Sequence, residues 1–536
     1  MISINNSVAA LLHELPLNSA LKMPEAPCLE FAGQRLSYAD LADAIECFGR
    51  GLVALDLPRG GRVAVFLEKR FETAVACFGA AAAGGVFVPV NPILKPQQVA
   101  YILRDCNVVV LVTSSERLQL LRPVLAACPD LRHIVVVDDG AHADPVASVP
   151  LHGWRQVLDA NTGSRHRVID RDVVAILYTS GSTGMPKGVV LSHQNMVAGA
   201  TSVASYLGNV SSDVILAALP LSFDAGFSQL TTAFHVGAKV VLLNYLLPRD
   251  VLNAVVAARV TGLTAVPPLY IQLAHLRWPT TVSEHLRYFA NTGGRMPLET
   301  LKSLRAALPK TRPFLMYGLT EAFRATYLPP EEVDRRPDSI GKAIPNAEIL
   351  VLRADGTPCA AHEPGELVQR GALVGLGYWN DPGKTAERFR PLPGLESGLV
   401  TTELAVFSGD TVRTDDEGFL YFIGRQDEMI KTSGYRVSPN EVEEVLYGSQ
   451  MVGECAVLGL PHQVLGQAIV AVATPLGDGA LDPVRLLGHC RDQLPAYMVP
   501  GHVDVRAGPL PRNPNGKIDR KELLREFLAA GEGDRR

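Results

Sequence analysis

The sequence predicts an α/β fold, and three observations support this expectation. Up to about residue 160, apolar helical stretches alternate with short β-branched runs, as in a doubly wound sheet. The same alternation returns after about residue 181 and is followed by a β-rich part. After residue 427 the pattern changes to a smaller α+β unit. At ~150 residues per domain, a chain of 536 residues is expected to contain about two to four such units.

Each expected element has a local signal. Short apolar, mostly β-branched runs predict strands at 63–66, 108–112, 134–137, 173–177, 189–191, 214–219, 240–243 and 265–266. Helices are predicted over 95–104 and 520–529, β-rich segments over 347–376 and 412–424, and a disordered tail over 531–536. The uncharged stretch 73–94 contains Gly84 and Gly85, so a buried helix, a glycine turn and a short strand fit it better than a membrane span.

Composition excludes several classes of protein. The 50 Lys and Arg against 55 Asp and Glu give a net charge of −5, without the basic excess of a dedicated nucleic-acid binder. The eight cysteines are scattered with no CxxC pair, which argues against a disulfide framework or a structural zinc site and suits a reducing cytosol. The first residues have no basic region before an apolar run, so no signal peptide is expected. We therefore expect a soluble, cytoplasmic protein with no nucleic-acid partner and no membrane insertion.

The strongest local motif is the segment 178–188, Tyr-Thr-Ser-Gly-Ser-Thr-Gly-Met-Pro-Lys-Gly, between two apolar strands. Small residues leave backbone N–H groups and hydroxyls free to surround phosphate oxygens, with a lysine charge alongside. The spacing differs from that of a Walker loop. A Gly/Ser/Thr loop alone is more often a plain turn, but a segment this long is far more specific. The candidate phosphate-binding residues are Thr179, Ser180, Gly181, Ser182, Thr183, Gly184 and Lys187.

This segment resembles the phosphate loop of the adenylate-forming superfamily, which includes acyl-CoA synthetases and adenylation domains of peptide synthetases. Later segments match further motifs of that family in family order: 317–321, 408–410 (with Ser408 where Thr is commoner), 424–427, 431–436, 494–500 and 515–520. The resemblance covers about residues 30–525. It implies a large N-terminal body over 1–425 that includes a small β-barrel-like subdomain. It also implies a hinge at 426–428 centred on Asp427 and a mobile C-terminal lid over 429–530.

The resemblance implies ATP-dependent activation of a carboxylic acid to an acyl-adenylate, with release of pyrophosphate, and transfer of the acyl group to a thiol. Lys517, Thr320 and Glu321 take the catalytic positions, and Glu321 is also the implied Mg²⁺ ligand. The other implied ATP-binding and AMP-binding positions are Gly294, Arg295, Tyr317, Gly318, Asp410 and Arg425, with the phosphate loop. Each residue alone has an ordinary alternative, such as a turn cap for Asp410 or a surface ion pair for Arg425. Only their joint occurrence favours the functional interpretation.

The implied acyl pocket leaves the substrate open between fatty, aryl and amino acids. Its candidate residues are Phe223, Asp224, Phe227, Gly293, Met316 and Arg324. Adenylation domains for α-amino acids carry Phe-Asp here, and an unpaired buried carboxylate is costly, so Asp224 hints at an amine-bearing acid. Alternatively Asp224 pairs with a protein cation such as Arg324 or caps the following helix. A further alternative is that Asp224 and Arg324 together bind an amine and a second carboxylate of the substrate.

The acceptor thiol is also open. Segments 494–500 and 515–520 look like those of carrier-loading adenylation domains, yet only 19 residues follow Lys517, too few for a fused carrier domain. The acceptor is therefore CoA or the phosphopantetheine of a separate acyl or peptidyl carrier protein, with Lys431, Gly434 and Tyr435 implied along the thiol tunnel. Segments 86–105 and 317–344 look similar to bacterial acyl-CoA ligases associated with exosortase systems, which favours CoA. A non-catalytic nucleotide-binding or acyl-binding relative is disfavoured because Lys517 and Glu321 are both present.

Overall fold

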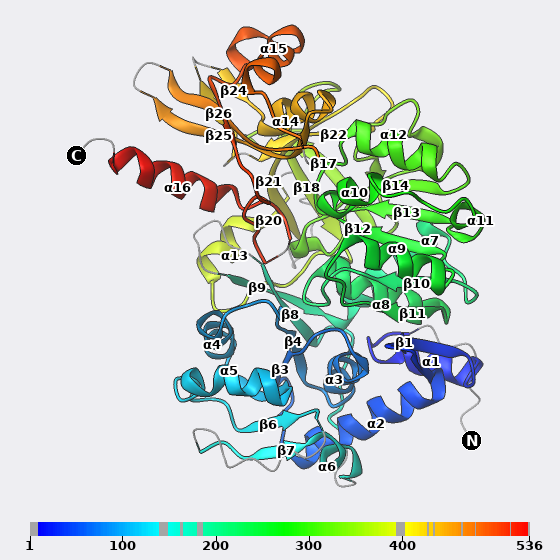
Figure 1. The fold of residues 1–536 in the computed structure, drawn as a ribbon. Helices are drawn as coiled ribbons and strands as arrows, with labels where there is room; N and C mark the ends of the chain where they lie inside the picture. Colours follow the sequence, from blue (N-terminus) through cyan, green and yellow to red (C-terminus); the bar gives the residue numbers. More distant parts are fainter. Residues whose placement is uncertain are drawn as a thin grey trace.

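The computed structural model contains four β-sheets with helices packed around them. It describes residues 9–138, 148–160, 165–179, 186–392, 403–425, 428–432, 435–462, 465–477, 479–514 and 516–533. The two largest sheets, blue to green, form the body, and the orange and red C-terminal unit lies at one end of it (Figure 1). This arrangement confirms the predicted α/β class.

The first large sheet has eight strands in the order β19-β9-β8-β4-β3-β5-β6-β7, of which β8, β4, β3, β5, β6 and β7 run parallel. Its strands are β3 (Arg62–Phe66), β4 (Val86–Pro89), β5 (Val108–Thr113), β6 (His133–Val136), β7 (Leu151–Gly153), β8 (Val173–Thr179), β9 (Lys187–Ser192) and β19 (Gly377–Tyr378). Its helices are α3 (Phe71–Ala82), α4 (Pro96–Asp105), α5 (Ser115–Leu125) and α6 (Trp154–Asp159). The buried helix, glycine turn and short strand predicted over 73–94 are α3, Gly84-Gly85 and β4.

The second large sheet has nine strands in the order β16-β15-β14-β13-β12-β10-β11-β1-β2, and β14, β13, β12, β10, β11 and β1 run parallel. Its strands are β1 (Pro27–Phe31), β2 (Gln34–Ser37), β10 (Val214–Ala217), β11 (Lys239–Leu242), β12 (Gly262–Ala265), β13 (Tyr288–Asn291), β14 (Arg312–Tyr317), β15 (Thr326–Leu328) and β16 (Lys342–Ala343). Its helices are α1 (Glu14–Lys22), α2 (Tyr38–Ala54), α7 (His193–Leu207), α8 (Asp224–Val236), α9 (Pro248–Ala257), α10 (Pro267–Ala274), α11 (Val282–His285) and α12 (Leu298–Ala307), with short 3₁₀ turns η1 (Thr320–Ala322) and η2 (Pro330–Glu332). The first two strands of the chain thus join the second sheet, which local patterns did not indicate.

A five-stranded antiparallel sheet forms the small β subdomain between the body and the C-terminal unit. It consists of β17 (Ala347–Leu352), β18 (Gly365–Gly371), β20 (Phe389–Pro391), β21 (Leu404–Thr414) and β22 (Leu420–Arg425), with helix α13 (Pro382–Arg388) before β20. Gly356 and Gly418 both have positive φ, a backbone conformation that glycine adopts readily in tight turns.

The C-terminal unit has its own sheet and its own apolar core. Its elements are β23 (Ile430–Thr432), β24 (Tyr435–Val437), α14 (Pro439–Gly448), β25 (Val452–His462), β26 (Gly466–Pro475), α15 (Pro483–Gln493), η3 (Ala496–Met498), β27 (His502–Val505) and α16 (Arg520–Gly533). Helix α16 continues beyond Ala529 to Gly533, so the tail expected to start at 531 was placed three residues early. Glycine weakens a helix by only about 1 kcal/mol, too little to stop one already formed. The rest of that expected tail, 534–536, lies outside the described residues.

The main apolar core lies between the two large sheets and is built from helices of both. Phe227 of α8 stacks on Phe78 of α3 and on Phe87 of β4, with ring centroids 5.6 and 4.7 Å apart. Local signals set the helix ends around this core: Ser37 and Ser192 cap α2 and α7, and Gly208 ends α7 in the left-handed conformation. In the described part of the chain, no helix has both the length and the apolar character needed to cross a bilayer.

Two buried histidines join α1 to α7. The ring of His193 accepts a hydrogen bond at Nδ1 from the Leu12 amide at 3.0 Å and makes an edge-on contact with His13. Burial is the main reason why the pKa of His13 falls to about 4 and that of His193 to about 3. Both side chains are therefore neutral in the folded protein at neutral pH.

This pair makes the body sensitive to acid. In the unfolded chain both histidines bind a proton near pH 6.5, whereas in the folded protein they stay neutral to a lower pH. Below pH 6.5 protonation therefore favours the unfolded chain, and the free energy of unfolding falls as the pH falls. Between pH 7.5 and 5.5 we expect the free energy of unfolding to fall by about 2 to 3 kcal/mol. Urea unfolding at the two pH values measures the loss, which His193→Asn should roughly halve and His275→Gln, at an exposed histidine, should leave unchanged. An equal pH dependence in H193N and the parent would contradict this assignment.

Candidate active site

The parallel strands of the second large sheet bring most of the predicted residues to one edge. Asp224 follows β10, Gly293 follows β13, and β14 ends in Tyr317, three residues before Thr320 in η1. These strands belong to the consecutive parallel run β14-β13-β12-β10, so their carboxyl ends lie at the same edge of the sheet. In open α/β sheets this edge is where ligands bind.

Tyr317, Asp410 and Arg425 form one cluster. Asp410 and Arg425 face each other directly across the β21–β22 pair, with Arg425 Nη1 3.5 Å from Asp410 Oδ1. The Tyr317 hydroxyl donates to Asp410 Oδ2 at 2.5 Å. Asp410 Oδ1 is buried and accepts no hydrogen bond from the described residues. Burial raises the pKa of Asp410, partly offset by Arg425 and Tyr317. The cluster therefore offers a buried carboxylate oxygen that fits the hydroxyl group of a ligand.

Glu321 and Lys187 meet at Tyr378. The Tyr378 hydroxyl donates to Glu321 Oε1 at 2.6 Å, and Lys187 Nζ lies 5.4 Å from the centroid of the same ring. Lys187 lies opposite Thr179 in the β8–β9 pair, so the predicted phosphate loop joins two paired strands. Burial and then the charge of Lys384 lower the pKa of Lys187. Positive charge thus accumulates here beside the carboxylates of Asp381 and Glu321. The loop residues Ser180, Gly181, Ser182, Thr183 and Gly184 lie outside the described residues.

The donor set at Glu321 suits magnesium held mainly by phosphate. Glu321 supplies a hard carboxylate beside Lys187, and among the described residues no group of three or more His, Cys, Asp or Glu side chains could hold a metal ion. Mg²⁺ commonly binds through one or two carboxylates, with phosphate and water oxygens completing its coordination. The residues present therefore fit Mg²⁺ bound together with a nucleotide.

Lys517 reaches this edge from the C-terminal unit. A Cβ added to Gly293 would lie 3.4 Å from Lys517 Cε, so the lysine stem passes directly over that glycine. The residue keeps accessible surface, yet desolvation lowers the pKa of Lys517, and the carboxylates of Asp224 and Asp410 partly offset this effect. Partial accessibility together with a pKa lowered by desolvation is expected for a side chain at the junction of two units. Lys517 thus lies within electrostatic range of groups from both the second large sheet and the β subdomain.

Asp224 has a protein partner. Arg324 Nη1 donates to Asp224 Oδ2 at 2.7 Å, and the two side chains are only 2% and 15% exposed. On the other carboxylate oxygen, Thr320 Oγ1 lies 3.5 Å away. Arg324 Nε is buried without a hydrogen-bond partner among the described residues. Of the alternatives that the sequence left open for Asp224, the structure contains the pair with Arg324.

Other predicted residues lie outside this group or differ from expectation. Phe227 is fully buried in the core, so its assignment to the acyl pocket was wrong: on α8 it lies almost one turn after Asp224 and turns toward Phe78 and Phe87. Met316 is 4% exposed and accepts a hydrogen bond from Tyr206.

Arg295 lies 3.7 Å from Glu444 of α14 and so contacts the C-terminal unit. Gly294 packs against Pro267, Gly318 against Arg324, and Phe223 precedes α8. Lys431 and Tyr435 are exposed on β23 and β24, where Tyr435 stacks on Tyr497. Asp427 and Gly434 lie outside the described residues.

Sequence reasoning missed Tyr378 and Arg388. Tyr378 links Glu321 to Lys187, although it lies 57 residues from Glu321 in the chain. The guanidinium of Arg388 lies against Gly409, where an added Cβ would come within 2.2 Å of Nη1, so a side chain at Gly409 would displace this arginine. The clue available beforehand was the glycine before Asp410, since a glycine there leaves room for a neighbouring group.

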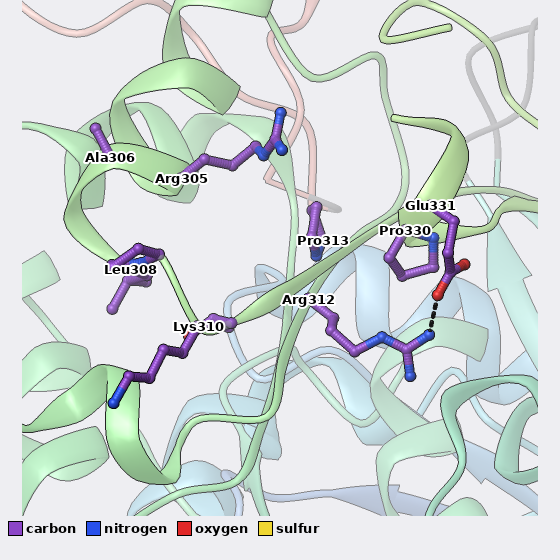
Figure 2. Close-up of a pocket in the computed structure, with 10 residues that line it drawn as sticks. Arg305, Ala306, Leu308, Lys310, Arg312, Pro313, Pro330 and Glu331 are labelled. Carbon is purple, nitrogen blue, oxygen red and sulfur yellow. Dashed lines mark hydrogen bonds and ion pairs between the residues drawn. The ribbon is translucent and has the colours of Figure 1, made fainter. Parts of the chain in front are cut away.

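A separate cavity of about 550 Å³ is not part of this site. It is lined by residues at the end of α12 and the start of β14 (Figure 2). Arg312 begins β14 whereas Tyr317 ends it, so the cavity lies at the amino edge of that strand. Its arginines already pair with carboxylates, Arg305 with Asp334 and Arg312 with Glu331, at 2.5 Å each.

Comparison with known proteins decides the family. A family model described as "AMP-binding enzyme" matches residues 18–379, and one described as "AMP-binding enzyme C-terminal domain" matches residues 441–517. The chain belongs to the AMP-binding enzyme family. This AMP-binding enzyme is accordingly an AMP-forming ligase, as its motifs predicted.

Two relatives and one solved structure illustrate the range of this family. The long-chain-fatty-acid–CoA ligase of Yersinia pestis is 30% identical, over 98% of this chain and 95% of its own. The L-proline–[L-prolyl-carrier protein] ligase of Pseudomonas fluorescens is also 30% identical, over 96% and 99%. The o-succinylbenzoate coenzyme A synthetase of Bacillus subtilis, solved in complex with ATP and magnesium ion, is 26% identical with a TM-score of 0.79, covering 95% of this chain and 98% of that one.

Proposed function

We propose that this AMP-binding enzyme activates a carboxylic acid with ATP and Mg²⁺ to an acyl-adenylate, releases pyrophosphate, and transfers the acyl group to CoA. The observation that carries the proposal is the position of Lys517, beside Gly293 and within electrostatic range of Asp224 and Asp410. Attack by a carboxylate on a phosphate brings two anions together, and a positioned cation stabilises the charge that develops. The ATP complex of the Bacillus subtilis relative supports the same cofactors.

The proposed nucleotide contacts follow from the two clusters. Asp410 would accept from ribose hydroxyls through Oδ1, which accepts no hydrogen bond from the described residues, and Tyr317 and Arg425 would hold the carboxylate in place. Lys187, with Thr179 and the loop residues between them, would hold the β- and γ-phosphates, and Glu321 would bind Mg²⁺. Thr320 would donate to the α-phosphate. Bound ATP supplies an electrophilic phosphorus with pyrophosphate as leaving group, and these residues bind and orient it.

The pocket favours an acid without an α-amino group. An ammonium-binding role requires Asp224 to have a free charge, but Arg324 already pairs with it in a buried site. A substrate ammonium beside this pair would place two cations against one carboxylate. One cation would then lack a partner, which is costly where water is excluded. The fatty-acid–CoA ligase of Yersinia pestis is consistent with this interpretation. Loading of an amino acid onto a separate carrier protein is the second candidate, supported by the equally similar L-prolyl-carrier ligase.

We further propose that the C-terminal unit, 429–530, moves as a lid on the body, 1–425, about a hinge at Asp427. The separate apolar core of the C-terminal unit supports this proposal. The two family models also treat the body and the C-terminal unit as separate domains, since they match 18–379 and 441–517. Closure would exclude water from the acyl-adenylate. Lid rotation would then bring Lys431, Gly434 and Tyr435 toward the thiol.

Pyrophosphate exchange across fatty, aryl and amino acids tests this assignment, followed by thioester formation with CoA or with carrier proteins. We expect exchange with fatty or aryl acids and thioester formation with free CoA. Exchange stimulated by amino acids alone would overturn the substrate assignment, and transfer to carrier proteins without any to CoA would overturn the acceptor. Absence of exchange with every acid would count against the adenylation reaction itself.

A further inference from the structure

One buried side chain of the body contacts the loop that carries Lys517. Asn91 follows β4, which pairs in parallel with β8, so its carboxyl end lies on the same edge of the sheet as that of β8 at Thr179. The side chain is 5% exposed. Its Nδ2 donates to the Pro514 carbonyl of the C-terminal unit at 2.6 Å, although the two residues are 423 positions apart. This hydrogen bond directly connects the first large sheet to the Lys517 loop.

The amide of Asn91 is oriented by its own turn. Its Oδ1 accepts the Ile93 N–H at 3.2 Å, so the other end of the amide, Nδ2, points toward Pro514. An Asx turn of this kind is a local structure that Asn and Asp both form. The donor is therefore fixed by the body before the C-terminal unit closes on it.

Hydrogen bonds connect the described residues of this loop to one another and to the C-terminal unit. The Lys517 amide donates to Asn513 Oδ1 at 3.1 Å, and the Asn513 amide donates to the Lys517 carbonyl at 2.8 Å. Arg512 donates to the Gly516 carbonyl at 2.7 Å and forms an ion pair with Glu454 of β25. Because the loop is internally tied, a contact at Pro514 also fixes the position of Lys517.

A second contact between the units lies elsewhere and has a different effect. Glu444 of α14 accepts from the Leu298 amide at the start of α12, at 2.9 Å, and lies 3.7 Å from Arg295. It holds α14 against the body but does not contact the 513–517 loop. Of these two hydrogen bonds between described residues of the two units, the Asn91 bond is the one that ends on the lysine loop.

We propose that Asn91 is a positioning residue for acyl-adenylate formation, which holds the Lys517 loop in the reactive arrangement through the Pro514 carbonyl. This inference rests on the proposed role of Lys517. With the lid rotation proposed above, the thioester step uses a different arrangement of the C-terminal unit and does not require this bond. Loss of Asn91 should therefore impair the first half-reaction selectively.

Asn91→Asp is the sharpest test. It keeps Oδ1 as the acceptor for the Ile93 N–H and replaces the Nδ2 donor by a second carboxylate oxygen, which would face the Pro514 carbonyl oxygen. We expect pyrophosphate exchange to fall about tenfold or more, the range for a lost buried hydrogen bond with an unpaired carbonyl. Thioester formation from synthetic acyl-adenylate should stay within about twofold of the parent. Asn91→Ala, which removes the donor without repulsion, should show a smaller loss of the same kind. The control Asn244→Asp makes the same chemical change at an asparagine whose side chain exchanges hydrogen bonds with the backbone of Lys69 in the body, and should leave both rates unchanged.

Hydrogen exchange of 512–518 without substrate provides a readout that does not depend on activity. In N91D we expect faster exchange at Gly516 and Lys517, whose amides are protected in the closed loop. Unchanged exchange and unchanged adenylation, or equal losses in both half-reactions, would overturn the proposal. If Lys517→Ala retained adenylation while N91D loosened the loop, the anchoring contact would stand and the role of Lys517 would be wrong.

Discussion

Replacing Lys517 with Ala should reduce acyl-adenylate formation by at least about a hundredfold, the usual cost of removing one preorganised charge-stabilising group. The lysine stem passes over Gly293, and its charge lies within electrostatic range of Asp224 and Asp410, so the variant removes a cation from the edge where the predicted residues gather. Pyrophosphate exchange with the preferred acid measures this step.

The second half-reaction separates a catalytic role from a folding defect. The K517A variant should form thioester from synthetic acyl-adenylate at close to the parent rate, because the lysine acts before the acyl-adenylate exists. Lys521→Ala, at an exposed lysine of α16, is the matched control and should affect neither step. Adenylation by K517A at the parent rate would show that this lysine is not the catalytic cation.

Replacing Arg324 with Met should destabilise the body by about 3 kcal/mol, at the low end for breaking a buried ion pair. Met fills similar space but leaves the Asp224 carboxylate with little solvent and no cation in direct contact. Thr320 lies 3.5 Å from the other carboxylate oxygen, and the charge of Lys517 also acts on Asp224, so both limit the cost. The first transition in urea unfolding measures this loss of stability.

The double variant Asp224→Asn, Arg324→Met tests the explanation. It removes both charges, so most of the lost stability should return. In R324M alone, Asp224 becomes available to a substrate ammonium, and any amino-acid-dependent pyrophosphate exchange should rise. Parent stability in R324M, or no recovery in the double variant, would show that the pair contributes little to the fold.

Local sequence patterns were sufficient for the fold class and for most strands. Runs such as 108–112 and 134–137 are strands because β-branched residues suit buried parallel sheets, and the structure confirms them as β5 and β6. Strand β12 begins at Gly262, earlier than the predicted 265, because the neighbouring strands β10 and β13 bond its backbone on both sides. Sheet membership was not predictable: β1 joins the second sheet and β19 the first through contacts distant in the chain.

The sequence by itself determined which chemical groups this AMP-binding enzyme carries and their order along the chain, because short motifs encode local backbone shape and side-chain type. Tertiary structure alone decided what each group contacts. It paired Asp224 with Arg324, turned Phe227 into the core, placed Tyr378 between Glu321 and Lys187, and joined Asn91 to Pro514. These contacts join residues from 57 to 423 positions apart. They depend on how sheets and helices pack, which the spacing of residues along one chain does not specify.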